Sequence, residues 1–536
     1  MASQNGDDPT REDISALSEP ADWSPEVDEI RRRREFAAAM GGEEGVARQR
    51  RAGKGTVRER IDGLLDAGSF REVGGLAGET EHVDGRLVAF TPSNCVIGTG
   101  TVRGVRIAVS GEDFSIRGGS SDGGGEQKDE FIEYLAHDWR IPLVRMLDGA
   151  GGSITGAIDE GRTHVPLSKN FAGMWRLLSE VPVVSAIMGP AAGSGAAKAV
   201  AAHFTVMVKG TSQIFVAGPP LVKRALGVDI HKDDLGGPSV HLYNGVADNL
   251  AGDEADCFAQ VRRFLSYLPS NVWEAPARRE TGDPPDRREE ELLSIVPRSR
   301  RRAYDARRIV DLVVDNESFF EMTPFFGRSI ITGLARLDGY AVGVTANDPK
   351  VIAGAMDRDS SEKLMRFVDF CDNFHLPVVN LVDQPGFMLG LAAESAGTPR
   401  MGMRMLWAVN QSTVPWVSVI VRKCFGVAGM AHYRFGRMNL RYAWPSAEWG
   451  VLPAEGGVEA AYRRQIAAAD DPDAERARLE AEVLRYSSPL LTAEIFGVEE
   501  VIDPRETRPL LCEFARTAHA AARTQLGPKT SWGMRP

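Results

Sequence analysis

Alternating apolar and amphipathic segments predict an α/β fold. Residues 105–114 ("VRIAVSGEDF") are an apolar run that ends in polar turn residues, which indicates a buried strand. Residues 126–139 ("EQKDEFIEYLAHDW") carry apolar residues at helical spacing, and residues 141–147 ("IPLVRML") indicate a second strand that ends at glycines. This strand–helix–strand order is typical of a largely parallel sheet with helices packed outside it.

The same pattern occurs twice along the chain. Asp148 recurs as Asp383 at an offset of 235 residues, and segment 181–193 recurs as segment 414–426 at an offset of 233. A repeat of this length is too long for a solenoid and indicates a duplicated domain. Because a strand followed by a glycine-rich turn is what repeats, we expect the chemistry at two related turns.

The chain of 536 residues is too long for one hydrophobic core. Residues 1–24 are polar and acidic and predict a disordered tail. Segment 269–304 is rich in Pro, Arg and Glu, has little apolar periodicity and is expected to connect the two halves. We therefore predict an N-terminal domain over residues 25–285 and a C-terminal domain over residues 286–536.

Charge and cysteine usage exclude several classes of protein. The net charge of −11 and the pI near 5.5 argue against nucleic-acid binding as the main task. Five widely spaced cysteines without a CxxC motif indicate a reducing compartment and no zinc ribbon. No apolar run approaches the roughly 18 residues of a membrane span, and the N-terminus resembles neither a secretory signal nor a transit peptide. We expect a cytoplasmic protein that binds no metal.

The first glycine turn lies within residues 187–204 ("IMGPAAGSGAAKAVAAHF"). Gly193, Ser194 and Gly195 connect an apolar strand to an Ala-rich helix, and a helix start leaves backbone N–H groups unpaired. Two such groups aimed at one point form an oxyanion hole. The alternative is that these glycines serve only tight strand–helix packing.

The second copy of the turn favours the functional interpretation. Gly426, Val427, Ala428 and Gly429 occupy the corresponding place in the second half. Backbone amides that polarise a carbonyl suit chemistry that passes through an enolate. A thioester carbonyl could be held at one turn and a second carbonyl at the other.

Two further loops are expected to line a ligand crevice. Residues 111–128, which include Gly118 and Gly119, precede the first amphipathic helix, and residues 347–363 are their counterpart. Loops at the C-terminal ends of parallel strands usually border a binding site. Neither loop is a Walker P-loop or a Rossmann fingerprint, so nucleotide hydrolysis and dinucleotide binding lack support.

The usual side-chain catalysts are missing. The sequence contains no HExxH motif, no GxSxG motif and no cluster of His, Cys and carboxylates. His203 and His432 follow the two turns, but helical histidines are more often structural than catalytic. Ser194 could be a nucleophile, yet no base partner is evident.

At these residues the chain resembles the carboxyltransferase (β) subunit of biotin-dependent acyl-CoA carboxylases, of the propionyl-CoA carboxylase and transcarboxylase type. The resemblance extends from about residue 53 to the C-terminus. Its most specific motifs are "EDFSIRGGS", "IMGPAAG", "DDLGGPSVH", "DPKVIAGAMDRDSSEK", "VDQPGF" and "YAWPSAEWGV".

The resemblance implies two tandem crotonase-like (ClpP/crotonase) domains built from ββα spiral repeats. The N-terminal domain would bind acyl-CoA, and the C-terminal domain would bind carboxybiotin. The active site would lie between the N-terminal domain of one subunit and the C-terminal domain of another, in a hexamer built as a trimer of dimers. Because the chain has no biotinylation site or ATP-grasp signature, a partner with biotin carboxylase and biotin carboxyl carrier functions is implied.

The resemblance also assigns site residues. Amides of Gly193 and Ser194 would hold the thioester oxygen, and amides of Val427 and Ala428, next to Gly426, would hold the biotin ureido oxygen. The residues implied in substrate binding are Gly118, Gly119, Gly151, Gly152, Gly386, Phe387 and Met430.

Several positions depart from the family pattern. Ser194 and Val427 replace glycines, and Val427 disfavours any positive φ and adds bulk near the biotin position. Residues 149–154 ("GAGGSI") lack the Asp and Arg of the family's loop. Met430 stands where the family places a residue that tunes acyl size, and an apolar, flexible Met points to a different or larger acyl group.

Three functions stay open at this point. The first is carboxyl transfer between carboxybiotin and the α-carbon of an acyl-CoA. The second keeps the fold but acts as an acyl-CoA decarboxylase, or another crotonase-type enzyme, without a biotin carrier. The third is a non-catalytic subunit of a carboxylase complex. A neighbouring gene for a biotinylated protein would separate the first from the second.

Overall fold

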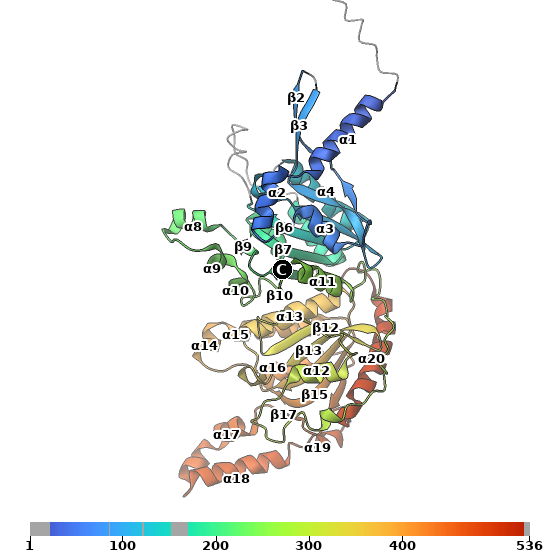
Figure 1. Cartoon of the computed structure of the whole chain (residues 1–536). Coiled ribbons are helices and arrows are strands. Elements are labelled where there is room, and N and C mark those ends of the chain that lie inside the picture. The colour runs from blue at the N-terminus through green and yellow to red at the C-terminus, as the bar shows by residue number, and fades with distance from the viewer. Residues whose placement is uncertain (1–21, 85, 121–122, 152–169, 530–536) are drawn as a thin grey trace, which may run out of the picture.

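Two sheets of the same topology form the core of the protein (Figure 1). The computed structural model describes residues 22–84, 86–120, 123–151 and 170–529. Each half contributes an 8-stranded sheet, and the strand order is identical when the strands are matched in sequence order. The α/β prediction and the duplication read from the sequence are both confirmed.

The first sheet has the order β1-β4-β5-β6-β7-β8-β10, with β9 paired to β7. β1, β4 and β5 pair antiparallel, and the pairs from β5 onwards are parallel. Its strands are β1 (Arg71–Val73), β4 (Cys95–Val102), β5 (Val105–Glu112), β6 (Leu143–Gly149), β7 (Val183–Ala192), β8 (Phe204–Val208), β9 (Gln213–Phe215) and β10 (Asn249–Ala251). A separate hairpin pairs β2 (Gly78–Val83) with β3 (Arg86–Pro92).

The second sheet repeats this arrangement as β11-β12-β13-β14-β15-β16-β18, with β17 paired to β15. Its strands are β11 (Phe320–Met322), β12 (Ile330–Leu337), β13 (Tyr340–Asn347), β14 (Val378–Gln384), β15 (Trp416–Phe425), β16 (Leu440–Ala443), β17 (Glu448–Gly450) and β18 (Glu500–Val501). The register also repeats, because Cys95 lies opposite Glu112 in the first sheet and Ile330 lies opposite Asn347 in the second.

Helices connect and cover the strands. Those of the first half are α1 (Ser24–Ala38), α2 (Gly42–Arg51), α3 (Val57–Leu64), η2 (Arg117–Gly119), α4 (Gly123–Asp138), α6 (Asn170–Glu180), α7 (Ser194–Val200), α8 (Pro219–Leu226), α9 (Lys232–Gly236), α10 (Pro238–His241) and α11 (Glu254–Leu265). Those of the second half are η3 (Glu290–Leu293), α12 (Ala306–Val313), η4 (Ile352–Gly354), α13 (Arg358–Asn373), α14 (Leu391–Ser395), α15 (Thr398–Gln411), α16 (Gly426–Gly429), η5 (Met430–His432), α17 (Ala454–Ala468), α18 (Pro472–Arg485), α19 (Pro489–Ala493), η6 (Pro504–Glu506), α20 (Thr507–Ala522) and η7 (Arg523–Gln525).

Aromatic side chains join the two halves. The ring of Phe264 on α11 stacks on Phe204 of β8 at 4.9 Å and on Phe370 of α13 at 5.7 Å between ring centroids. All three side chains are buried in one apolar cluster that contains residues of both sheets. The two domains therefore share a continuous core across the layer between α11 and α13 (Figure 1).

The connecting segment packs mainly on the second half. Segment 269–304 contains one short helix, η3, within residues that are otherwise coil. Arg278 pairs with Asp338 at 2.8 Å, and Asp283 accepts from Arg287 and contacts Arg508 at 3.3 Å. The domain boundary after residue 285 stays a prediction.

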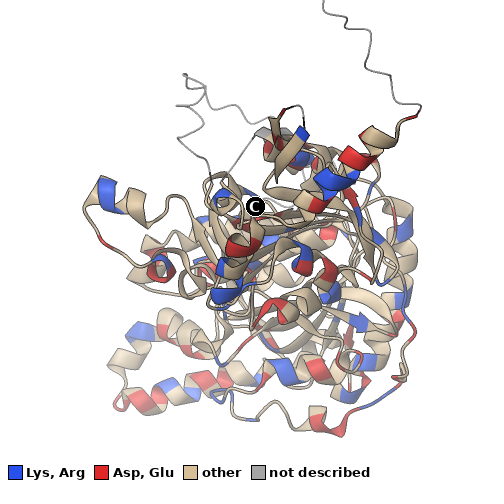
Figure 2. Ribbon diagram, turned by 45° about the horizontal axis from the view of Figure 1, so that its top comes forward, with Lys and Arg blue, Asp and Glu red and all other residues tan. Residues whose placement is uncertain are grey.

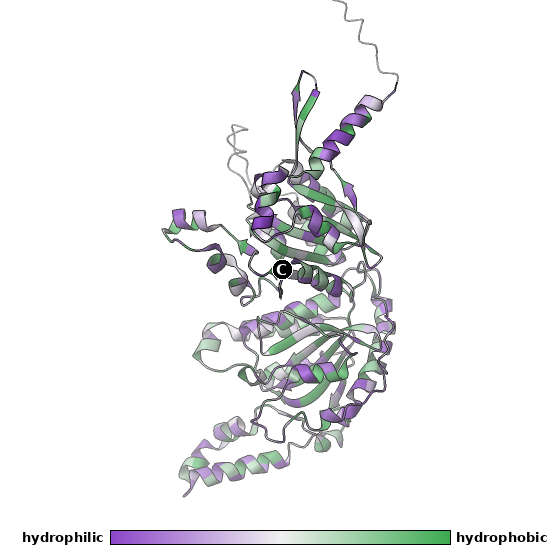
Figure 3. Ribbon diagram, viewed as in Figure 1, coloured by the Kyte–Doolittle hydropathy of each residue, from purple (hydrophilic) through white to green (hydrophobic). Residues whose placement is uncertain are grey.

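The N-terminal region projects from the first sheet. Residues 1–21 of the expected tail lie outside the described residues, and α1 begins at Ser24. α1 and the β2–β3 hairpin extend together from one end of the molecule, while α17 and α18 extend from the other (Figure 1). Acidic and basic residues are interspersed over the ribbons (Figure 2), and the central strands of the two sheets are largely hydrophobic (Figure 3). Within the described residues, no helix is long and apolar enough to cross a membrane.

Candidate active site

The first glycine turn follows the C-terminal end of β7. Gly193 takes φ 59° and ψ −114°, a conformation that favours glycine, and α7 begins directly after it. Gly193 and Ser194 are exposed to solvent, whereas Gly195 is buried. The turn therefore presents the start of α7 at the surface, at the carboxyl end of a central parallel strand.

One of the two expected donors at this turn is already used. The N–H of Gly193 donates to the carbonyl of Phe215 at 3.2 Å, which continues the β7–β9 pairing. No hydrogen bond to another described residue occupies the N–H of Ser194. The free donors at this turn thus begin at Ser194, and Gly193 provides the backbone bend.

The second glycine turn has the same construction at the end of β15. Gly426 takes φ 63°, and α16 carries Val427 and Ala428 in its first turn. Within the described part of the chain, the N–H groups of Val427 and Ala428 have no hydrogen-bond partner. The positive φ falls on Gly426 and not on Val427, so a branched residue fits at position 427 without backbone strain.

The loops before α4 meet at the carboxyl ends of β5 and β6. Gly118 and Gly119 in η2 take φ values of 65° and 66°. Ser120 forms a parallel bridge with Gly151, which itself takes φ 85°. The structure thus brings Gly118, Gly119 and Gly151 together, while Gly152 lies outside the described residues.

The second half repeats this loop pair. Ala353 and Gly354 in η4 take φ values of 56° and 81°. Met356 bridges Phe387, and the Met356 N–H donates to the carbonyl of Gly386 at 3.1 Å. Gly386 and Phe387 therefore lie next to η4 at the end of β14, as Gly151 lies next to η2.

Buried aspartates fix the strand ends beside both turns. Asp148 of β6 is fully buried and contacts Lys54 Nζ and Arg60 Nη1, each at 2.8 Å, and Gln49 Nε2 at 3.0 Å. Gly189 of β7 leaves room for this carboxylate, because a Cβ at that position would lie 1.8 Å from Asp148 Oδ1.

Asp383 occupies the equivalent place in the second half. It pairs with the buried Arg422 of β15 at 2.8 Å and accepts from the Lys423 N–H at 3.1 Å. The Asp383 N–H donates in turn to Asn347 Oδ1 at 3.1 Å. Asp383 therefore holds the backbone of β15 directly, whereas the Asp148 carboxylate contacts side chains from the segment before the first sheet.

The two histidines near the turns are structural. His203 is fully buried, accepts from the Val183 N–H at 3.0 Å and contacts the carbonyl of Leu178 at 2.9 Å. Burial lowers the pKa of His203 to about 3 and that of His432 to about 4, so both rings are neutral at pH 7. Within the described residues, neither histidine forms a hydrogen bond with the Ser194 hydroxyl.

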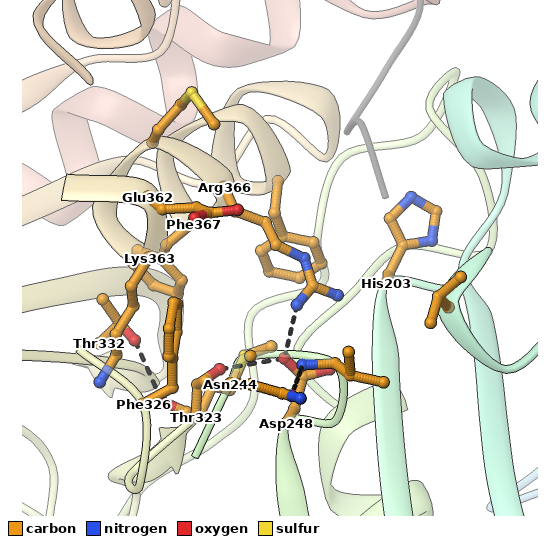
Figure 4. Close-up of a pocket in the computed structure, with 16 residues that line it drawn as sticks. His203, Asn244, Asp248, Thr323, Phe326, Thr332, Glu362, Lys363, Arg366 and Phe367 are labelled. Carbon is orange, nitrogen blue, oxygen red and sulfur yellow. Dashed lines mark hydrogen bonds and ion pairs between the residues drawn. The ribbon is translucent and has the colours of Figure 1, made fainter. Parts of the chain in front are cut away.

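Cavities adjoin the second turn and the contact between the two domains. One of about 230 Å³ is next to the second turn and is lined by Gly426, Gly429, Met430 and His432, among others. Another, of about 340 Å³, lies between the two domains (Figure 4). In it the Arg366 guanidinium reaches across to Asp248 at 3.1 Å.

The charged residues beneath the first turn were not predicted from the sequence. Lys54 and Arg60 are buried, and Glu112, Asp129 and Lys198 are half-buried. The repeat contained a signal for Glu112. At the offset of 235 that relates Asp148 to Asp383, Glu112 aligns with Asn347, so a charged residue in the first half corresponds to an uncharged one in the second.

Comparison with known proteins shows the family of the chain. The carboxyl transferase domain family matches residues 48–531. The chain is 38% identical to the propionyl-CoA carboxylase carboxyltransferase subunit of Haloferax mediterranei, over 93% of this chain and 97% of that protein. It is 36% identical to the methylmalonyl-CoA decarboxylase subunit alpha of Veillonella parvula, over 92% of this chain and 95% of that protein.

A solved structure shows the same fold. The transcarboxylase 12S crystal structure, described as a hexamer assembly with methylmalonyl-coenzyme A and methylmalonic acid bound, aligns with a TM-score of 0.86 and 31% identity. The alignment covers 97% of this chain and 100% of that one. The chain therefore belongs to the carboxyl transferase family and is an enzyme of the acyl-CoA carboxylase and transcarboxylase type, built on two crotonase-like domains.

Proposed function

We propose that this chain transfers a carboxyl group between carboxybiotin on a carrier protein and the α-carbon of an acyl-CoA, through an enolate. The observation that carries the proposal is the pair of helix starts at the two turns, where α7 begins at Ser194 and Val427 is the second residue of α16. Each of these two residues follows a glycine of positive φ at the end of a central strand, and each turn presents backbone N–H groups without a partner in the described part of the chain. Such donors stabilise developing negative charge on oxygen.

At the first turn the thioester oxygen is the natural acceptor. The Ser194 N–H serves as the donor, with the next amide of α7 behind it, while the Gly193 N–H is held by Phe215. Gly118, Gly119 and Gly151 form the neighbouring wall, and their lack of side chains lets a ligand approach the backbone. We assign this crevice of the N-terminal domain to acyl-CoA.

At the second turn we assign the N–H groups of Val427 and Ala428 to the ureido oxygen of biotin. The site fits this group, because uncharged amide donors suit a neutral ureido carbonyl and a cavity of about 230 Å³ adjoins the turn. When bound, carboxybiotin supplies carbon dioxide and a nitrogen that accepts the α-proton. Met430 borders the same cavity and is assigned to the acyl group of the substrate.

The two turns belong to different sheets, so one chain does not bring them to a single crevice by strand adjacency. We propose that the active site forms between the N-terminal domain of one subunit and the C-terminal domain of another, in a hexamer like that of transcarboxylase 12S. A biotin carboxylase and biotin carboxyl carrier partner completes the reaction. The five buried, unpaired cysteines fit a reducing, cytoplasmic setting.

Replacing Ala428 with Pro tests the second turn. Ala428 lies in the first turn of α16, where its N–H has no partner in the described structure, so proline deletes a donor without breaking a helical bond. We expect carboxyl transfer, measured with the biotinylated carrier and an acyl-CoA panel, to fall about 100-fold to 1000-fold. Acyl-CoA binding, measured by calorimetry, should persist.

The matched control is Ala428→Gly, which keeps the N–H. Activity of Ala428→Pro within about tenfold of the unmodified chain would exclude this turn as the second oxyanion hole. If both variants left the activity of the whole complex unchanged, the chain would be a non-catalytic subunit.

A further inference from the structure

A group of half-buried titratable side chains lies beneath the first turn. Lys198 of α7 pairs with Asp129 of α4, and Asp129 also accepts from the Ser110 hydroxyl at 3.0 Å. Glu112, at the end of β5, is the third charged residue of this group, and its Oε2 accepts from the Asp148 N–H at 2.8 Å. These residues connect the helix that starts at the first turn with the loop that contains Gly119.

The second domain shows that the fold does not require this group. The register and the offsets of the repeat match Glu112 with Asn347, Asp129 with Leu364, and Lys198 with Ala431. Where the first domain carries an acid, a second acid and an amine, its copy carries an amide and two apolar residues. The charges of the first domain are therefore an addition to the scaffold.

Asn347 also shows how the Glu112 carboxyl is held. Asn347 accepts from the Asp383 N–H and donates through Nδ2 to the carbonyl of Gly354 at 3.2 Å. Glu112 accepts from the equivalent Asp148 N–H, and Gly119 is the equivalent of Gly354. A protonated Glu112 can copy both bonds, with its O–H directed to the carbonyl of Gly119.

Glu112 lies beside the loop glycines that border the crevice assigned to acyl-CoA. Glu112 Oε2 and the carbonyl oxygen of Gly119 both lie within 2.9 Å of the point that a Cβ on Gly149 would occupy. Gly149 ends β6 beside Gly151, and β6 pairs with β7, which leads into the first turn. The Glu112 side chain is half-buried, so the crevice can reach it.

Burial, more than the surrounding charges, keeps the Glu112 carboxyl near its midpoint of titration at neutral pH. Burial raises the pKa of Glu112 to about 7, Lys198 opposes that rise, and Asp129 and Asp148 add to it. At neutral pH a substantial fraction of the chains therefore carries the proton.

We propose that Glu112 donates a proton to the α-carbon of the acyl-CoA enolate, which gives this chain a decarboxylase activity toward malonyl-type CoA thioesters that needs no biotin. The inference rests on the proposed function, because it places the acyl-CoA in the first crevice. In carboxyl transfer the α-proton goes to an acceptor on the carrier. In this decarboxylation the proton comes from Glu112 of the chain itself.

The step balances without a further reactant. The bond between the α-carbon and the carboxylate breaks, carbon dioxide leaves, and the electron pair forms the enolate, whose oxygen accepts from the Ser194 N–H. The Glu112 O–H bond then breaks, its proton joins the α-carbon, and the resulting carboxylate takes a proton from water.

The test measures carbon dioxide release from malonyl-CoA and methylmalonyl-CoA by the full chain, without biotin or carrier, between pH 6 and pH 9. We expect release that declines as the pH rises through about 7, where Glu112 ionises. E112Q should release carbon dioxide at least tenfold more slowly than the unmodified chain. Its amide can make both bonds of Asn347, so its melting temperature should match that of the unmodified chain.

The control variant is E81Q, because Glu81 is an exposed carboxylate on the β2–β3 hairpin. It should keep the full rate. Absence of release by the unmodified chain, a rate of E112Q within threefold of it, or the same pH profile in both would overturn the role of Glu112. Carboxyl transfer by the unmodified chain with its carrier is measured separately, so failure of the proposed function is seen independently.

Discussion

The two domains neutralise the same buried carboxylate in different ways. Asp148 is paired with Lys54 and Arg60, which come from the segment before the first sheet. Asp383 is paired with Arg422, which lies on the strand next to it in its own sheet. In the first domain the position next to the carboxylate is Gly189, which has no side chain. In the second domain the corresponding position is Arg422, the cation that pairs with Asp383.

The comparison shows which features both domains share and which belong to one domain alone. Both copies need a carboxylate that accepts from groups around the strand end, and both need a glycine of positive φ after the central strand. The source of the countercharge is not fixed by the fold. The first domain takes the cations that pair with Asp148 from residues before its sheet, whereas the second domain takes the cation that pairs with Asp383 from its own sheet.

The largest expected effect comes from removing the two aspartates. Asp148→Ala leaves Lys54 and Arg60 buried with one partner fewer, and we expect the free energy of unfolding to fall by about 3–5 kcal/mol. Asp383→Ala leaves the buried Arg422 without its carboxylate partner. We expect its loss in the free energy of unfolding to lie at the lower end of that range. Urea unfolding followed by circular dichroism measures both losses.

The comparison is sharpened by the matched pair K54M and R422M. Lys54→Met leaves Asp148 with Arg60 as a partner, whereas Arg422→Met removes the cation of Asp383. A larger loss for K54M than for R422M would contradict the view that the first domain distributes its countercharge over two residues.

The next effect concerns the first turn. Ser194→Pro removes the free N–H at the first position of α7, where proline is well tolerated. We expect enolate formation, followed as α-proton exchange of a bound acyl-CoA in deuterated water with the biotinylated carrier present, to fall about 100-fold to 1000-fold. Ser194→Ala keeps the N–H and is the control. Equal rates for both variants would place the oxyanion hole elsewhere.

The sequence predicted the architecture better than the electrostatics. The offset between Asp148 and Asp383 identified the duplication, and glycine spacing located both turns, because the backbone conformation at Gly193 and Gly426 demands that residue type. The use of the Gly193 N–H by Phe215 was not predictable, since β9 returns to β7 from more than twenty residues further on. Lys54 and Arg60 also lie far from Asp148 in sequence, and only the tertiary fold brings them together.

A smaller effect concerns Lys363, which matches Lys128 of the first domain at the offset of 235. Lys363 is buried, and its Nζ donates to the carbonyl of Ile330 at 2.8 Å. Burial lowers the pKa of Lys363 to about 7. Because the unfolded chain keeps a pKa near 10.4, it binds more protons between pH 7 and pH 10, so stability due to this residue rises with pH in that window.

Lys363→Met removes the cost of burying the charge. We expect a gain of about 1–3 kcal/mol in the free energy of unfolding at pH 7, and a smaller gain at pH 9.5, where the folded amine is already neutral. Urea titrations at the two pH values measure the difference. A gain that grows with pH would contradict the lowered pKa.

The smallest expected effect comes from exchanging the residues that differ between the two turns. Ser194 and Val427 occupy the same position after a glycine of positive φ, and both side chains are exposed. If both turns stabilise an oxyanion through the backbone N–H, Ser194→Val and Val427→Ser should each change the rate of carboxyl transfer by less than about threefold, because both variants keep that N–H. Stability should change by less than about 0.5 kcal/mol, as is usual for surface positions. A loss of more than tenfold in Ser194→Val alone would show that the first turn depends on its hydroxyl and that the two turns are not chemically equivalent.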